Sequence, residues 1–150
     1  MLIIEEKKDK TRFLPILIIG DEQLSMIEKY INTASLFVLY DDEPRAAAAV
    51  CDNGHGVYEI KNIAVKPEYQ RRGYGSALID FICRCYALEM QKLILGTGAG
   101  TSVVDFYKKL GFSEYGLIKN YFSDNYDLPI IEDGILLRDM VLMERTAKSL

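Results

Sequence analysis

The chain has 150 residues, of which 49% are hydrophobic and 27% charged, a balance typical of a globular domain and not of a disordered chain. Its formal net charge of −4 excludes the positive excess that drives binding to nucleic-acid phosphates and favours a cationic partner. The longest apolar stretch, residues 13–19, is far shorter than the roughly 20 residues of a membrane-spanning helix. We therefore expect one cytoplasmic domain over residues 1–150, with no nucleic-acid or membrane partner.

The cysteines and the single histidine argue against a disulfide framework and against a metal site. Cys51, Cys83 and Cys85 are odd in number and lie inside apolar runs, as buried thiols of a cytoplasmic protein do. His55 is the only histidine and sits in a glycine-containing turn. We expect no metal ligand set from these residues.

The first half of the chain is expected to form mainly strands joined by tight turns. Residues 13–19 fit either a strand or a short helix, and a helix over residues 22–32 would use Asp21 as its N-cap. A run of four alanines prefers helix, but it is short and bracketed by turns, so a strand is predicted there. The expected strands are residues 2–4, 35–40, 45–51 and 57–65, with turns at 41–44 and 52–54.

The second half alternates helices and strands. A helix over residues 76–90 is predicted from an apolar stripe at helical spacing: Leu78, Phe81, Ile82, Cys85 and Leu88. A second helix carries Val103, Phe106, Tyr107 and Leu110, and Gly111 ends it. Strands are expected at 92–95, from 112–115 and at 139–144, with a turn at 132–134. This order predicts an α/β (α+β) fold whose mixed, mostly antiparallel central sheet has helices on both faces.

The segment Gln70-Arg71-Arg72-Gly73-Tyr74-Gly75-Ser76 lies between a predicted strand and a predicted helix. The first turn of a helix presents unpaired amides and a partial positive charge, and glycines let a phosphate approach the backbone. Arginine side chains add cations that can bind phosphate oxygens in a forked geometry. The glycines could merely make a turn, but the combination predicts a pyrophosphate-binding loop.

The loop also resembles the signature of the GNAT superfamily of N-acetyltransferases, carried here by Gln70, Gly73 and Gly75. Residues 59–65 resemble the central strand of that family, and residues 105–112 resemble its helix-to-strand signature, so the likeness covers about residues 57–115. Residues 116–144 resemble the tail of a bacterial subgroup. The resemblance implies the GNAT fold and acetyl-CoA as co-substrate, with no metal.

The resemblance further implies direct attack of a substrate amine on the thioester, without an acyl-enzyme. By position in the motifs, Tyr107 would protonate the departing thiolate and Glu59 would act as general base, directly or through water. Alternatively, Tyr107 is only an aromatic residue of the core, and Glu59 is only a solvated glutamate of the strand. Backbone amides of Ile63, Ala64 and Val65 would bind the oxyanion and the pantetheine arm. Where many members of the family have asparagine this chain has Gly100, so Thr101 or Ser102 would supply a hydroxyl instead.

The acceptor is expected at the aromatic and acidic stretch between residues 114 and 132, where rings and carboxylates suit a cation. The residues concerned are Tyr115, Tyr121, Phe122, Asp124, Tyr126, Asp127 and Glu132, although they could also form an ordinary surface loop. A small cationic amine or a peptide amine is predicted. The alternatives are a non-catalytic acetyl-CoA sensor, an enzyme for longer acyl groups, and a toxin-like enzyme acting on charged tRNA, which the acidity disfavours. A homodimer is possible.

Overall fold

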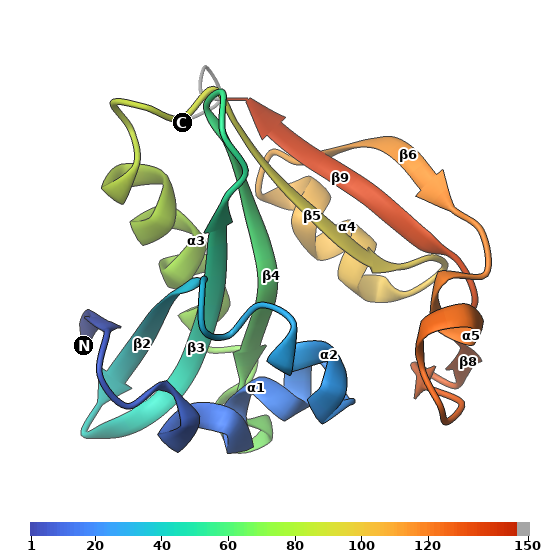
Figure 1. Cartoon of the computed structure of the whole chain (residues 1–150), viewed down its shortest axis with the longest axis horizontal. Coiled ribbons are helices and arrows are strands. Elements are labelled where there is room, and N and C mark those ends of the chain that lie inside the picture. The colour runs from blue at the N-terminus through green and yellow to red at the C-terminus, as the bar shows by residue number, and fades with distance from the viewer. Residues whose placement is uncertain (147–150) are drawn as a thin grey trace. The chain divides into compact units, whose positions relative to one another are not determined.

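The computed structural model describes residues 1–146 and divides the chain into two compact units, the first ending at Gln91 and the second beginning at Lys92. The first unit comprises, in order, β1 (Leu2–Glu6), the 3-10 helix η1 (Lys10–Phe13), α1 (Leu14–Gly20), α2 (Leu24–Glu28), β2 (Ser35–Asp41), β3 (Glu43–Asp52), β4 (Val57–Val65), the 3-10 helix η2 (Pro67–Tyr69) and α3 (Tyr74–Cys85). Figure 1 shows its strands as one sheet, in which β1, β2, β3 and β4 pair with their neighbours in antiparallel fashion.

The sheet of the first unit is covered on both faces by helices. Strand residues alternate between the faces, so Ala47 and Ala49 pack with the core beneath α1 and α2. On the other face, Phe37 meets the rings of Phe81 and Tyr86 at 5.5 and 6.2 Å. The alanine run lies fully buried between these layers, where small side chains allow both helix layers to approach. The predicted strand is therefore confirmed, and packing overrides the helix propensity of alanine.

Strand β4 carries a β-bulge at its centre. Ala49 of β3 stands opposite Asn62, but the next residue, Val50, stands opposite Ile60, which leaves Lys61 as the extra residue of the bulged strand. A bulge interrupts the alternation of side chains and re-aims them, and bulges are frequent beside active sites. The side chains of Lys61 and its neighbours on β4 therefore need not follow the regular alternation of a strand.

The second unit comprises β5 (Lys92–Gly98), α4 (Ser102–Lys109), β6 (Ser113–Ile118), α5 (Tyr121–Asn125), β7 (Ile131–Glu132), β8 (Ile135–Leu136) and β9 (Met140–Thr146). Strand β9 lies between β5 and β6 and is antiparallel to both, while β7 and β8 form a separate hairpin. Two predicted turn devices are confirmed. Gly111 follows α4 with a φ of +92°, and Asp133-Gly134 join β7 to β8 with φ values of 52° and 72°.

Two predicted helices have wrong boundaries, and residues 13–19 are resolved as helix by α1. The helix expected over 22–32 contracts to α2, because the Asp21 carboxylate accepts the hydroxyl of Tyr30 at 2.9 Å instead of capping backbone amides. The helix expected to reach residue 90 ends at Cys85, because Tyr86 leaves helical geometry and stacks on Tyr58 at 4.2 Å. Leu88, expected on the buried stripe, is consequently 99% exposed. No helix within residues 1–146 is both long enough and apolar enough to cross a membrane.

Candidate active site

The predicted phosphate loop has the backbone conformation that anion binding requires. It joins η2 to α3, and Gly73, with a φ of +85°, is the N-cap of α3. Apart from Gly73 itself and its two chain neighbours, no residue within 1–146 has an atom within 4 Å of the position where a β-carbon on Gly73 would stand, so its backbone is open to a ligand. Arg71 also has a positive φ, 64°, which is uncommon and costly for a residue with a side chain. Alternating left-handed residues of this kind turn successive amides toward one concavity, a known anion-binding arrangement.

Two side chains of the loop serve to hold it in place. The amide of Gln70 donates a hydrogen bond to the carbonyl of Val65 at 3.1 Å, which ties the loop to the end of β4. The buried Tyr74 hydroxyl donates to Asp41 at 2.7 Å and accepts from Arg45 at 2.9 Å. The bond to Asp41 and burial raise the pKa of Tyr74. Gln70 and Tyr74 can therefore offer a ligand mainly their backbone.

The exposed cations of the loop are Arg71 and Arg72. The guanidinium of Arg72 lies 5.5 Å from the ring centre of Tyr69, which limits its freedom. Ser76 stands in the first turn of α3 and is partly exposed. Two exposed arginines beside a helix N-terminus provide the positive charge that a phosphate group requires.

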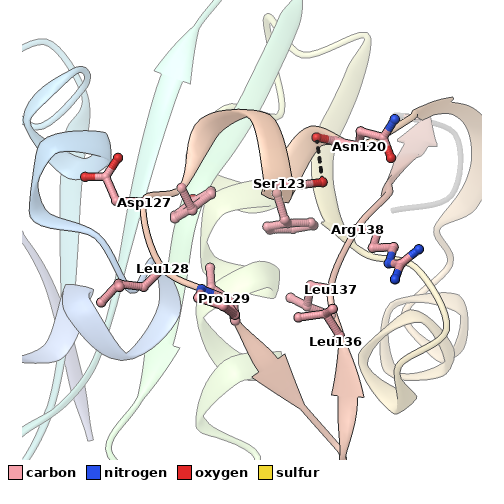
Figure 2. A pocket seen from close by; sticks show the side chains of 11 residues that line it. Asn120, Ser123, Asp127, Leu128, Pro129, Leu136, Leu137 and Arg138 are labelled. Carbon is pink, nitrogen blue, oxygen red and sulfur yellow. Dashed lines mark hydrogen bonds between the residues drawn. The ribbon is translucent and has the colours of Figure 1, made fainter.

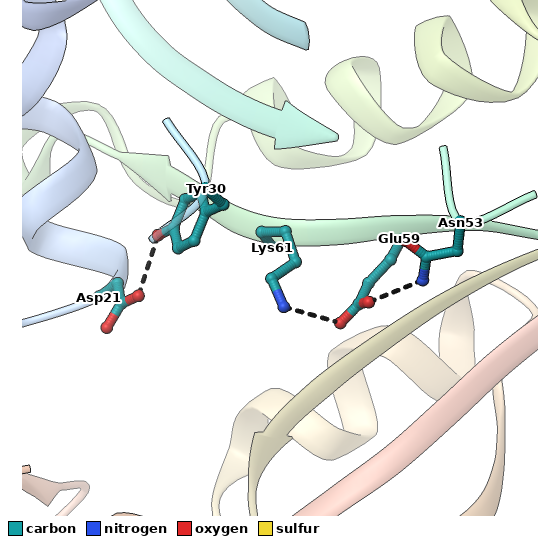
Figure 3. Close-up of polar contacts among 5 residues, drawn as sticks. All are labelled: Asp21, Tyr30, Asn53, Glu59 and Lys61. Carbon is teal, nitrogen blue, oxygen red and sulfur yellow. Dashed lines mark hydrogen bonds and ion pairs between the residues drawn. The ribbon is translucent and has the colours of Figure 1, made fainter. Parts of the chain in front are cut away.

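Glu59 is held by two neighbours on the same hairpin, as Figure 3 shows. Its carboxylate accepts a hydrogen bond from the Asn53 amide at 2.9 Å and forms an ion pair with the Lys61 ammonium at 3.4 Å. About a quarter of its side chain, 26%, is exposed to solvent. The carboxylate is thus oriented on β4 and accessible, as a general base must be. The residues Ile63, Ala64 and Val65, which follow the bulge, pair with the alanine run of β3.

A buried polar chain runs beside Glu59 and was missed by the sequence reasoning. Asn62 is only 4% exposed, and its amide donates hydrogen bonds to the carbonyl of Leu17 at 2.8 Å and to the hydroxyl of Tyr30 at 3.1 Å. Tyr30 in turn donates to Asp21 (Figure 3). A β-carbon on Gly20 would fall 2.3 Å from the Asn62 carbonyl oxygen, so α1 must end in glycine here. The sequence feature that could have indicated this buried polar chain is an asparagine inside an apolar strand.

In the second unit, Tyr107 on α4 is 6% exposed and packs between the rings of Phe106 and Phe112, at 5.2 and 5.6 Å. Within residues 1–146 its hydroxyl makes no hydrogen bond. Burial, and to a smaller extent the charge of Glu132, raise the pKa of Tyr107 well above its usual range. The phenol is thus fully protonated near neutrality, and its proton is available to a ligand.

Other hydroxyls at the start of α4 are already engaged. Thr101, the buried N-cap residue, donates its hydroxyl to the carbonyl of Gly98 at 3.0 Å. The backbone amide and the hydroxyl of Ser102 both donate to Asp133, at 3.0 and 2.7 Å, and these bonds lower the pKa of that carboxyl. A contact from Thr101 to a ligand would therefore use its oxygen lone pairs.

A cavity of about 380 Å³ opens in the second unit between α5 and the β7–β8 hairpin. Phe122, Tyr126 and Asp127, three of the residues expected on the acceptor side, line it, whereas Asp124 does not. Sequence reasoning missed the contribution of Arg138 and of several leucines. In Figure 2, Asp127 stands on one side of these apolar side chains and Arg138 on the other. The cavity thus combines apolar walls with one anionic and one cationic residue.

Comparison with known proteins supports an acetyl-transfer site. Residues 32–114 match the family model described as acetyltransferase (GNAT) domain. The chain is 29% identical over 140 residues to the N-acetyltransferase YvbK of Bacillus subtilis (strain 168), covering 91% of this chain and 89% of the relative. It is 30% identical over 101 residues to the [ribosomal protein bS18]-alanine N-acetyltransferase of Escherichia coli (strain K12), covering 63% of each.

Among solved structures, the chain is similar to a GNAT family acetyltransferase from Elizabethkingia anophelis with acetyl-CoA bound. The TM-score is 0.89, the sequence identity is 30%, and 97% of each chain is covered. It is also similar to an IAA acetyltransferase from Bacillus cereus ATCC 14579, with a TM-score of 0.88, 27% identity, and coverage of 97% of this chain and 99% of the other. These likenesses confirm the predicted fold class.

Proposed function

The chain belongs to the GNAT family of N-acetyltransferases, and on that premise we propose that it acetylates a primary amine by direct attack of the amine on acetyl-CoA. The observation that carries this proposal is Tyr107, a buried phenol whose hydroxyl has no hydrogen-bond partner within residues 1–146. A phenol that is held by its ring contacts and whose hydroxyl is not committed to another group can donate its proton to a reacting atom. The thiolate that leaves acetyl-CoA needs such a donor.

In the proposed reaction, each of the assigned groups acts in one step. Glu59 removes a proton from the acceptor ammonium, directly or through water, because an amine with a pKa near ~10.4 is protonated near neutrality. The neutral nitrogen attacks the thioester carbon, and backbone amides of Ile63, Ala64 or Val65 stabilise the oxyanion. The carbon–sulfur bond then breaks, Tyr107 protonates the sulfur, and the nitrogen loses its second proton to solvent, from which Tyr107 regains one.

For the binding of acetyl-CoA, we assign the pyrophosphate to the loop before α3. The open backbone at Gly73, the first-turn amides of the twelve-residue helix α3, and the arginines Arg71 and Arg72 support this assignment. Thr101 would contact the co-substrate only through its lone pairs.

For the acceptor, we propose a small cationic amine or a peptide amine. The relative that acetylates an alanine of ribosomal protein bS18 has, by its name, a protein amine as acceptor. In this chain, the cavity lined by Phe122, Tyr126 and Asp127 offers two aromatic rings and a carboxylate, which suit a cation.

The proposal is tested by following CoA release from acetyl-CoA with a thiol-reactive dye, across polyamines, aminoglycosides, amino acids and peptides with free N-termini. Acceptor-dependent release that falls in the Tyr107→Phe variant is the expected result. If the chain binds acetyl-CoA in calorimetry but releases no thiol with any amine, direct transfer to an amine is contradicted and a sensor role is favoured.

A further inference from the structure

The bulge of β4 carries a lysine whose side chain contacts the candidate base of the same strand. Lys61 is the extra residue of the bulge, and its ammonium lies 3.4 Å from the Glu59 carboxylate (Figure 3). We propose that Lys61 is a self-acetylation site, a built-in amine to which the chain transfers acetyl from acetyl-CoA. This inference rests on the proposed function, because it uses the same base and the same acetyl donor.

The surroundings of Lys61 are those of a bound amine substrate. A carboxylate on one side and an aromatic face on the other are the groups that recognise an ammonium ion. Glu59 supplies the first. The ring of Tyr30 supplies the second, with its centroid 5.9 Å from the Lys61 nitrogen. The side chain is 36% exposed, so the nitrogen is accessible to a second molecule.

The groups that hold Lys61 are themselves fixed. The amide of Asn53 donates to one oxygen of Glu59 at 2.9 Å, which leaves the other oxygen directed at Lys61 (Figure 3). The Tyr30 hydroxyl is bonded to Asp21 and to the buried Asn62, which fixes the ring beneath the ammonium. The amine is therefore presented by an ordered site, and an ordered nucleophile beside its base reacts faster than a free one.

Lys10 provides a contrast within the same unit. Its ammonium donates to three backbone carbonyls, those of Ile31, Asn32 and Ala34, at 3.1, 3.3 and 2.6 Å. Within residues 1–146 no carboxylate forms an ion pair with Lys10, so no candidate base lies beside this amine. Lys8 offers a second contrast, because it is exposed and lies outside the bulge. The rates at which Lys8 and Lys10 are labelled therefore measure uncatalysed chemical acetylation.

The reaction balances without any additional reagent. The Lys61 ammonium gives one proton to Glu59, which passes it to solvent, and the neutral nitrogen forms a bond to the acetyl carbon. The bond from that carbon to the CoA sulfur breaks, the sulfur gains a proton from Tyr107, and the nitrogen loses its second proton to solvent, from which Tyr107 regains one. The products are an amide at Lys61, which keeps one hydrogen, and free CoA thiol. Because the amide is no longer nucleophilic, the reaction stops at one acetyl group for each site.

The test incubates the whole chain with acetyl-CoA bearing a deuterated acetyl group and no acceptor, and follows each lysine by peptide mass spectrometry. We expect Lys61 to be labelled faster than Lys8 and Lys10, with a half-time independent of protein concentration. Glu59→Gln is expected to slow this labelling by about 10²-fold or more, the usual contribution of a general base. Tyr107→Phe, which keeps Glu59, serves as the second slow variant, and the heat-denatured chain gives the chemical baseline.

Labelling of Lys61 no faster than Lys8, or a rate that Glu59→Gln leaves unchanged in a folded variant, overturns the inference. The Lys61→Arg variant, which keeps a cation beside Glu59, separates this failure from failure of the proposed function. If it acetylates free amines while Lys61 of the natural chain stays unlabelled, the inference alone falls. If neither free amines nor Lys61 receive acetyl, both fall. If only Lys61 is labelled, the inference stands and transfer to a free amine is wrong.

Discussion

Removing one oxygen atom from Tyr107 should separate catalysis from stability. The Tyr107→Phe variant keeps the ring contacts with Phe106 and Phe112 and removes only the hydroxyl. Because that hydroxyl makes no hydrogen bond within residues 1–146, its loss leaves no described partner unpaired. We expect the melting temperature to be unchanged, since the ring contacts that pack the side chain are kept and no hydrogen bond is lost.

The effect on turnover should be large. General acid catalysis contributes about 10²- to 10⁴-fold, which corresponds to a barrier increase of roughly 3–5 kcal/mol when the donor is lost. The assay is single-turnover thiol release from acetyl-CoA, so that product release does not mask the chemical step. Because the pKa of Tyr107 is raised by burial, the phenol stays protonated beyond the usual tyrosine value of ~10. The natural enzyme should therefore show no activity loss from this group below about pH 10.

Tyr30→Phe is the matched control, because the Tyr30 hydroxyl is engaged in hydrogen bonds. It donates to Asp21 at 2.9 Å and accepts from the buried Asn62 at 3.1 Å. Leaving such partners unsatisfied costs about 1–3 kcal/mol, or roughly 2–12 °C in melting temperature for a chain of this length. An unchanged single-turnover rate in Tyr107→Phe would refute the acid role. A melting temperature lowered as far as in Tyr30→Phe would show instead that the Tyr107 hydroxyl is structural.

Three further predictions concern the base, the phosphate loop and a loop carboxylate. Glu59→Gln should lower kcat/KM by about 10²-fold or more near neutrality and by less at high pH, where the amine loses its proton unaided; a pH–rate profile parallel to that of the natural enzyme would contradict this. Replacing both Arg71 and Arg72 with alanine should raise the KM for acetyl-CoA about tenfold or more but leave that for acetyl-pantetheine, which lacks the phosphates, unchanged. Hydrogen bonds from Ser102 lower the pKa of Asp133, so its ionised form stabilises the fold above the usual aspartate pKa of ~3.9, and this contribution is lost as the pH falls through the folded-state value. Asp133→Asn should therefore lower the melting temperature near neutrality, with the difference shrinking in acid, and a constant difference would exclude this linkage.

The amino-acid sequence by itself determined the features that depend on neighbouring residues. Turn residues placed the hairpins, and Gly111 marked the end of α4. The sequence predicts an anion site in the loop from Gln70 to Ser76, because its glycines, its arginines and the following helix are contiguous. Each of these signals acts within a few residues, where local backbone geometry and hydrogen bonding decide the outcome.

Only the tertiary structure decided the features that depend on partners distant in the chain. The alanine run is a strand because two helix layers bury it, and α3 ends early because Tyr86 stacks on Tyr58. The uncommitted hydroxyl of Tyr107 likewise follows from packing between elements, and such contacts outweigh local propensity wherever a side chain is buried. The pairing of Lys61 with Glu59 joins two residues of one strand, and the tertiary structure adds the bulge at Lys61 and the Tyr30 ring near its ammonium.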